Sequence, residues 1–146
     1  MTIKVGFVGL SITGWASIAL APSLLRISLA NSYTLTAVST TSVDSSSASA
    51  KKYSEALGHT IKPFYGDTSQ IASDPDVDLV VVAVKAPLHK AAVLPIIEAG
   101  KDVFVEWPAG VGLQETSIIA EAARKKGVRT MVGLQGRHAP SIKKVN

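Results

Sequence analysis

Polar and aromatic side chains that could bind a small molecule follow four apolar runs of this chain, at the point where each run ends. They are Ser11 and Thr13, Thr40 and Thr41, Lys85 and His89, and Glu106 and Trp107. If the runs are parallel strands of one sheet, their carboxyl ends meet at a single edge, where the ligands of such sheets bind. The pattern therefore predicts one site at that edge.

The first of these places is a glycine turn. Gly9 and Gly14 have the spacing of the first and last glycines of G-x-G-x-x-G, with Ser11 at the middle position. That motif brings backbone N–H groups and a helix N-terminus to a pyrophosphate, and a serine hydroxyl can also donate to a phosphate oxygen. The alternative is a flexible strand–helix turn that binds nothing. The motif predicts cofactor contact for the whole loop: Gly9, Leu10, Ser11, Ile12, Thr13 and Gly14.

The second place bears on the choice between NAD and NADP. In an NAD-selective site an acidic residue after the second strand binds the ribose 2′-hydroxyl. Thr40 stands there, followed by Thr41. Because hydroxyls can donate to a 2′-phosphate that a carboxylate would repel, the sequence favours NADP. No arginine clamp accompanies the threonines, and Asp44 in the serine-rich stretch that follows could restore NAD binding.

The composition narrows the class of protein. The chain has no cysteine, which excludes disulfides and cysteine metal sites and suits a reducing, cytoplasmic compartment. The net charge is +4, but aromatic and basic residues do not interleave, so no nucleic-acid partner is predicted. The apolar stretch before Ala21 resembles a secretory signal peptide, but the glycine turn within it disfavours that interpretation. No apolar run approaches the roughly 20 residues that span a bilayer, and no ligand spacing predicts a metal site.

Apolar runs and helical stretches alternate along the chain. Strands are expected at 3–8, 33–39, 61–65, 79–83, 103–106 and 129–134. Helices are expected at 14–30 with a break at Pro22, 45–57, 68–72, 87–99 with a kink at Pro95, and 113–126. The alternation predicts an α/β fold of three layers, a doubly wound, mostly parallel Rossmann sheet with helices on both faces. Residues 1–140 form one dinucleotide-binding domain in this interpretation, and 141–146 begin a further helix.

Two segments and a histidine resemble one protein family closely. Ser73–Ala83, His89 and Glu98–Pro108 are similar to the N-terminal domain of the glucose–fructose oxidoreductase and inositol dehydrogenase (Gfo/Idh/MocA) family, and the resemblance covers nearly the whole chain. Within the family, four segments resemble the branch of the fungal galactose-regulon repressor: Gly6–Leu10, Gly14–Ala16, Val105–Trp107 and Leu134–Arg137. That branch is known for binding NADP without an evident catalytic task, whereas other members are dehydrogenases.

Two departures from the family pattern bear on function. The family's Glu-Lys-Pro motif uses its lysine to bind the substrate hydroxyl and the nicotinamide ribose, and here Trp107 replaces it. Tryptophan has no charge to stabilise a developing alkoxide, but it can stack on a nicotinamide or a sugar. Val84-Lys85-Ala86 replaces the family's Thr-Pro-Asn, so Lys85 either contacts a cofactor phosphate or partly replaces the lost charge.

The sequence allows two roles for each of three further residues. The resemblance places His89 near the cofactor, while its position also suits a helix-capping or packing role. Glu106 either hydrogen-bonds the ribose or is a solvated carboxylate at a strand end. Trp107 either stacks on the ligand or packs against the protein.

The resemblance implies the cofactor-binding half of an NADP-dependent oxidoreductase that acts on a sugar-like alcohol. Family members carry a C-terminal substrate domain with an aspartate–histidine pair, which this sequence lacks, so no catalytic residue is assigned and no turnover is expected from this chain alone. The alternative is a non-catalytic NADP-sensing module that binds a protein partner, and Trp107 favours it. A methyltransferase is disfavoured by the segment His89–Pro108. Apolar surface that the missing domain would cover is expected to bind a protein partner or a second copy.

Overall fold

A computed structural model of the chain describes residues 2–140 and 144. Six parallel strands form one sheet in the order β3-β2-β1-β4-β5-β6. The strands are β1 (Ile3–Val8), β2 (Tyr33–Thr40), β3 (Lys62–Tyr65), β4 (Leu79–Val82), β5 (Asp102–Glu106) and β6 (Thr130–Gly133). The chain runs outward from β1 to β3 and returns to place β4 beside β1, which is the order of dinucleotide-binding sheets. The expected helix at 141–146 lies outside the described residues, apart from Lys144.

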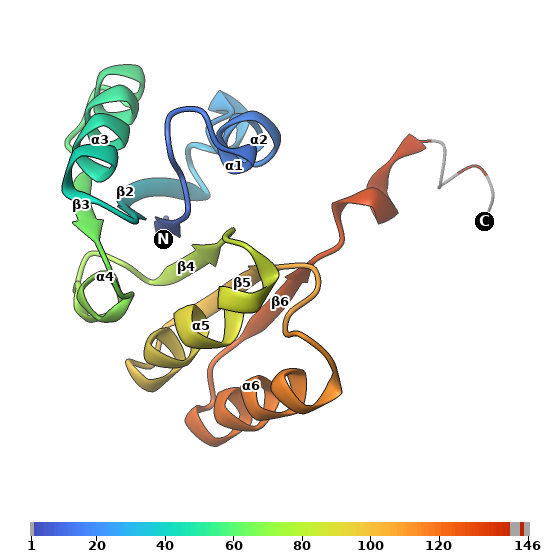
Figure 1. Cartoon of the computed structure of the whole chain (residues 1–146). Helices are drawn as coiled ribbons and strands as arrows, with labels where there is room; N and C mark the ends of the chain where they lie inside the picture. The colour runs from blue at the N-terminus through green and yellow to red at the C-terminus, as the bar shows by residue number, and fades with distance from the viewer. Residues whose placement is uncertain (1, 141–143, 145–146) are drawn as a thin grey trace.

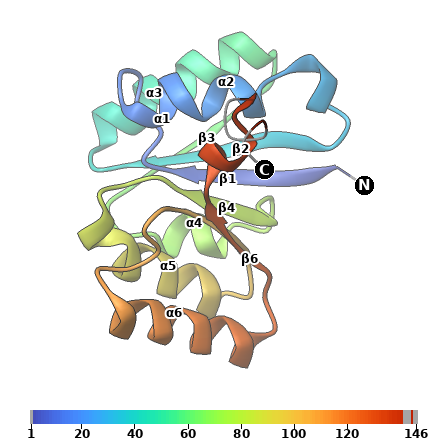
Figure 2. The same ribbon diagram turned by 90° about the vertical axis from the view of Figure 1, so that its right-hand side faces the viewer.

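Helices cover the sheet on both sides, which confirms the three predicted layers (Figures 1 and 2). One side carries α1 (Trp15–Ala19), α2 (Ala21–Leu24) and α3 (Val43–Leu57). The other side carries α4 (Ser69–Ser73), α5 (His89–Glu98) and α6 (Leu113–Lys126). Short 3-10 turns occur at η1 (Ile27–Leu29), η2 (Ala86–Leu88) and η3 (Gln135–His138).

The stretch expected to be helical over 14–30, with a break at Pro22, is divided into α1, α2 and η1, and the first break lies at Leu20, just before the expected place. Pro22 has no N–H to donate to a preceding turn, so α1 ends at Ala19 and Pro22 stands in the first turn of α2. The helix expected from Ser45 begins at Val43, since the Ser42 hydroxyl accepts a hydrogen bond from the Ser45 N–H and caps α3. Pro95 lies inside α5 and does not divide it.

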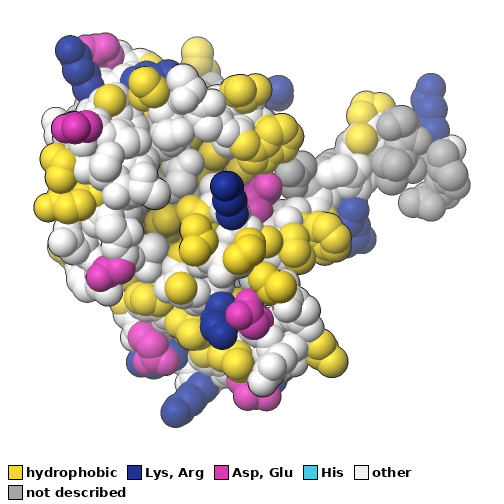
Figure 3. Space-filling model, in the orientation of Figure 1, with side chains coloured by type: hydrophobic (Ala, Val, Ile, Leu, Met, Phe, Trp, Pro, Cys, Tyr) yellow, Lys and Arg dark blue, Asp and Glu magenta, His cyan; other side chains and the backbone are white. Residues whose placement is uncertain are grey.

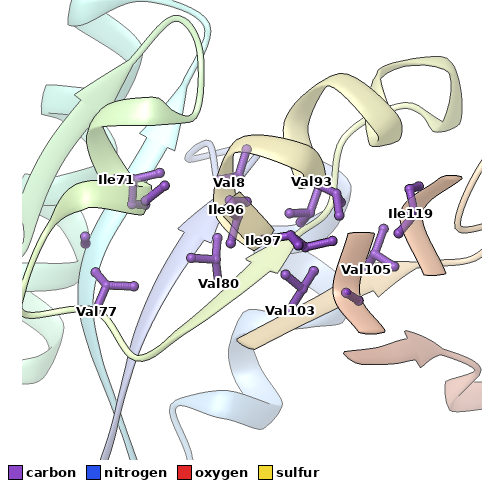
Figure 4. Close-up of a cluster of buried hydrophobic side chains, with 14 residues drawn as sticks. Val8, Ile71, Val77, Val80, Val93, Ile96, Ile97, Val103, Val105 and Ile119 are labelled. Atoms are coloured by element: carbon purple, nitrogen blue, oxygen red, sulfur yellow. The ribbon is translucent and has the colours of Figure 1, made fainter. Parts of the chain in front are cut away.

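Each face of the sheet has its own hydrophobic core. Because side chains alternate along a strand, Val80 and Val82 of β4 point to α5, while Val81 points to the opposite side. Figure 4 shows the larger core, in which Val93 and Ile96 of α5 pack over β4 and β5. The continuous apolar run of β4 is thus explained by its central place, with both faces covered.

Ion pairs hold the loop before β4 to the amino ends of the strands. Asp76 contacts Lys4 at 2.8 Å and Lys62 at 2.9 Å, and Lys62 also contacts the buried Asp74 at 2.9 Å. The hydrogen bonds from Lys4 and Lys62 lower the pKa of Asp76 to about 2. In return, the hydrogen bond to Asp76 raises the pKa of Lys4.

An apolar cavity of about 370 Å³ opens on the α1/α2 side of the sheet. Its walls include Leu24 of α2, Phe7 of β1, Phe104 of β5 and Met131 of β6. Met131 is 64% exposed, so this face presents apolar surface to solvent.

Candidate functional site

The predicted site residues gather at the carboxyl edge of the sheet. In the strand register, Val8 lies beside Ser39 on one side and Val82 on the other, and Val82 lies beside Val105. The loops that follow β1, β4 and β5 therefore emerge together, on the left of Figure 2. Figure 3 views this edge from the front and shows hydrophobic side chains across its middle, with basic and acidic side chains beside them.

Packing explains the two glycines of the turn after β1. Gly9 has a φ of +91°, and a Cβ there would lie 2.3 Å from the carbonyl oxygen of Ala83 at the end of β4. A Cβ on Gly14 would lie 2.5 Å from the Ser11 hydroxyl. The turn is therefore drawn tightly against β4 and against itself, which leaves its backbone close to the edge of the sheet.

The other residues of this turn differ in how deeply their side chains are buried. The side chain of Leu10 is fully buried in the core, so only its backbone can meet a ligand. Ile12 and Thr13 are exposed, and Ser11 is half-buried. If the loop contacts a cofactor as predicted, Leu10 does so through its backbone alone, and Ser11 and Thr13 do so through both backbone and side chain.

Helix α3 supports the glycine turn from the side. The Ser49 hydroxyl donates to the carbonyl oxygen of Leu10, and Lys52 Nζ donates to the carbonyl oxygen of Ile12 at 3.0 Å. Ser49 and Lys52 are one turn apart on α3 and so share a face. Lys52 brings a positive charge to the turn, and no local pattern in the sequence indicates this role.

A cavity of about 230 Å³ adjoins the glycine turn. It lies between the carboxyl ends of β1 and β2, the loop after β3 and the first turns of α5. Its apolar wall is formed by Val8, Val84, Leu88, Ala91 and Ala92, and its polar wall by Ser39, Thr40, Thr41, Asp67 and Thr68. Ser39 and Asp67 were not predicted, because strand and loop residues of these types are common outside ligand sites.

Thr40 and Thr41 both line this cavity, but they differ in exposure to solvent. Thr40 is 9% exposed, and its hydroxyl donates to the carbonyl oxygen of Ser42 at 3.3 Å. Thr41 is exposed. The hydroxyl best placed to donate to an incoming phosphate is therefore that of Thr41.

His89 joins two loops of the edge from inside the protein. It is 1% exposed, with Nδ1 2.8 Å from the carbonyl oxygen of Pro108 and Nε2 2.9 Å from that of Val84. These contacts connect the loop after β4 to the loop after β5, where the Trp107–Pro108 peptide is cis. Both ring nitrogens are thus engaged by backbone, which is a packing role, and cofactor contact by His89 stays a prediction. Lys85, in the first of these loops, is exposed.

Two exposed indoles lie near Glu106 at the other end of the edge. Trp15 Nε1 donates to Glu106 Oε2 at 3.3 Å, across the gap between the glycine turn and β5. Trp15 is 63% exposed and Trp107 66% exposed, so neither packs in the core. Trp15 was not among the predicted contacts, although it directly follows Gly14.

The described part of the chain offers neither a metal centre nor a membrane-spanning helix. Within it, no three histidine, aspartate or glutamate side chains stand close enough to hold a metal ion. None of its helices has the length and apolar character needed to cross a membrane.

The fold and the glycine turn agree with a comparison of sequences. Residues 3–134 match the oxidoreductase family GFO_IDH_MocA, through its NAD-binding Rossmann fold. The chain belongs to this family. The predicted resemblance and fold class are both confirmed by that match and by the strand order.

Relatives of this Gfo/Idh/MocA domain include enzymes and a regulator. Dehydrogenase aclE of Aspergillus oryzae is 42% identical over 117 residues, which cover 80% of this chain and 31% of that protein. The galactose/lactose metabolism regulatory protein GAL80 of Saccharomyces cerevisiae is 33% identical over 150 residues, covering 96% of this chain and 32% of that protein. The chain therefore spans about a third of the length of these relatives.

Solved structures show the same two kinds of relative. A super-repressor mutant of Gal80p from Saccharomyces cerevisiae has a TM-score of 0.83 at 29% identity, over 99% of this chain and 37% of that one. The 3-ketoreductase KijD10 from Actinomadura kijaniata, in complex with TDP-benzene and NADP, has a TM-score of 0.80 at 25% identity, over 99% and 42%.

Proposed function

We propose that this domain binds NADP, in preference to NAD, as the cofactor-binding part of an oxidoreductase that acts on a sugar-like alcohol. The observation that carries the proposal is the cavity beside the glycine turn, at the place where the strand order reverses between β1 and β4. In open α/β sheets, that crevice is where dinucleotides bind.

The residues at the edge fit the parts of a dinucleotide. The turn from Gly9 to Gly14 would take the pyrophosphate, since its glycines let backbone approach closely and Lys52 adds a positive charge beside it. The cavity would take the adenosine. The exposed indoles of Trp15 and Trp107, with Glu106 at the carboxyl end of β5, would flank the nicotinamide ribose.

The preference for NADP rests on Thr40 and Thr41. No carboxylate stands at the end of β2 to bind a ribose 2′-hydroxyl, and the exposed Thr41 can donate to a 2′-phosphate. Asp67 also lines this cavity, and its negative charge opposes this preference. The hydrogen bond from the Ser69 backbone N–H lowers the pKa of Asp67, which keeps it charged at neutral pH.

The test is a pair of titrations that follow quenching of the exposed Trp15 and Trp107. NADPH is expected to bind more tightly than NADH. Equal affinities would refute the role of the threonines while leaving the domain a nucleotide binder. If neither nucleotide binds, the proposed function is wrong.

A second candidate function is a non-catalytic module that senses NADP and binds a protein partner. Trp107 favours it, because an uncharged side chain stands where the family has a lysine. The similarity to GAL80 supports the same interpretation. The apolar surface that includes Met131 is a candidate contact for such a partner or for a second copy. The absence of cysteine suits a cytoplasmic location for either candidate.

A further inference from the structure

The loop between β5 and α6, residues 107–112, is held by contacts from two helices. At its start, Nδ1 of His89 in α5 lies 2.8 Å from the carbonyl oxygen of Pro108. At its end, the Glu115 carboxylate in the first turn of α6 accepts a hydrogen bond from the Val111 N–H at 3.0 Å. The loop therefore has an anchor on each helix, and both anchors act on its backbone.

Glu115 also connects the loop to α5. Its Oε1 lies 3.0 Å from Lys90 Nζ, and Lys90 directly follows His89 in that helix. A Cβ on Gly110 would lie 2.8 Å from the Cβ of Glu115, so the backbone of the loop packs closely against this side chain. Glu115 is thus the residue at which the loop, α5 and α6 meet.

The hydrogen bond of Glu115 orders the loop more than it caps the helix. A glutamate three residues after the N-cap usually accepts from the N-cap N–H. The N-cap of α6 is Gly112, and its N–H donates to the carbonyl oxygen of Gly110 at 2.9 Å instead. Glu115 reaches one residue further, to Val111. Because a glycine stands on each side of Val111, this part of the loop has much conformational freedom for the bond to restrain.

We propose that Glu115 positions Trp107 against the nicotinamide by holding this loop. The inference rests on the proposed function, in which the exposed indole of Trp107 flanks the nicotinamide ribose. Glu115 does not touch the nucleotide in this role, because it acts through the backbone of the loop. If the loop is released, fewer molecules hold Trp107 in the binding position, and the apparent dissociation constant rises in proportion.

The experiment compares the affinities of NADPH and of 2′-phospho-ADP-ribose, which lacks the nicotinamide, by calorimetric titration. Glu115→Ala removes the bond to Val111 and is expected to weaken NADPH binding about three- to tenfold. Its affinity for 2′-phospho-ADP-ribose is expected to stay within about twofold of wild type, because that ligand does not reach Trp107.

Glu115→Gln separates the hydrogen bond from the ion pair. The glutamine keeps a side-chain oxygen that can accept from the Val111 N–H, and it loses only the charge that faces Lys90. Because partly exposed ion pairs contribute little, NADPH affinity is expected to stay within about twofold of wild type.

The fluorescence of Trp107 gives a readout that a loss of stability alone would not change. The chain has two tryptophans, so a Trp15→Phe background leaves Trp107 as the single indole. Saturating NADPH is expected to quench this indole less when Glu115→Ala is added. Glu121→Ala removes an exposed carboxylate from the same helix and is the matched control, which should keep both the affinity and the quenching.

The outcomes separate the inference from the function. If Glu115→Ala lowers the melting temperature but leaves NADPH affinity and Trp107 quenching unchanged, Glu115 only stabilises α6 and the proposal is refuted. The proposal is also refuted if Glu115→Ala weakens both ligands equally, or if Glu115→Gln loses as much NADPH affinity as Glu115→Ala. If the wild-type protein binds neither ligand, the proposed function itself fails and the inference with it.

Discussion

At the scale of single residues, Gly9 and Gly66 share a backbone conformation but not an environment. Gly9 has a φ of +91°, and a Cβ there would lie 2.3 Å from the Ala83 carbonyl oxygen, whereas Gly66 has a φ of +81° with nothing within 4 Å of such an atom. Gly66→Ala is expected to lower the free energy of unfolding by about 1–2 kcal/mol, the cost of the left-handed conformation. Gly9→Ala is expected to cost about 2–5 kcal/mol, because overpacking against β4 is added.

Urea denaturation of the two variants measures this difference. Equal losses would mean that the turn can move away from β4, and that its close contact with Ala83 is not required by the fold. Because the displaced turn is the proposed pyrophosphate site, Gly9→Ala should also weaken NADPH binding.

Single residues differed in how far sequence could predict them. Spacing and place after a strand were enough to predict that Gly9, Gly14 and Thr40 lie at the carboxyl edge of the sheet, since motif and position are local properties. Lys52 was not found, because its role depends on a contact between segments far apart in the chain. The Lys52 contact to Ile12 spans 40 residues.

At the scale of elements, α3 and the glycine turn act as one unit through Lys52. Lys52→Met removes the hydrogen bond to Ile12 and the positive charge beside the proposed pyrophosphate. NADPH affinity is expected to fall about three- to tenfold, and the loss should shrink at high salt because ions screen the charge. Lys51→Met changes the neighbouring exposed lysine and serves as the control. An equal loss in both variants would show that only net charge matters.

The ion pairs of Asp76 tie the loop before β4 to β1 and β3, and they make stability depend on pH. The pKa of Asp76 is about 2 in the folded protein against an ordinary 3.8, so the pairing contributes fully above about pH 5 and is lost as the pH falls toward 2. Asp76→Asn should be less stable than wild type at neutral pH, with the difference vanishing near pH 2.

Urea denaturation of Asp76→Asn at a series of pH values tests this dependence. Glu121→Gln, on the exposed side of α6, is the control and should remain close to wild type. A constant difference between Asp76→Asn and wild type down to pH 2 would contradict the ion-pair explanation.

Elements were predictable where local signals mark both ends. Helix α6 was predicted with the bounds that the structure has, since apolar spacing marks its face and Gly127 ends it in the left-handed conformation. For the stretch 14–30 the break near Pro22 was predicted but the bounds of the pieces were not, because its apolar residues continue past Pro22 and mark no helix end. The parallel sheet with helices on both faces followed from the alternation of strands and helices.

At the scale of the whole molecule, the chain spans about a third of the length of its relatives. Within the described residues of the edge, His89 is buried with both ring nitrogens engaged, and Glu106 is held by Trp15. We therefore expect this chain to bind NADP without reducing it in the presence of polyols or sugars. Absorbance at the nicotinamide band measures this, and any sustained NADPH formation would contradict it.

We propose that a nucleotide lies across the carboxyl edge, from the cavity beside the glycine turn to the exposed Trp15 and Trp107. The most direct measurement is a two-dimensional ¹⁵N NMR titration of the labelled chain with NADPH. We expect shifts in the turn Gly9–Gly14, in Ser39–Thr41 and in the loops after β4 and β5, with Met131 and its neighbours unchanged. Shifts confined to the apolar face around Met131, or none at all, would contradict it.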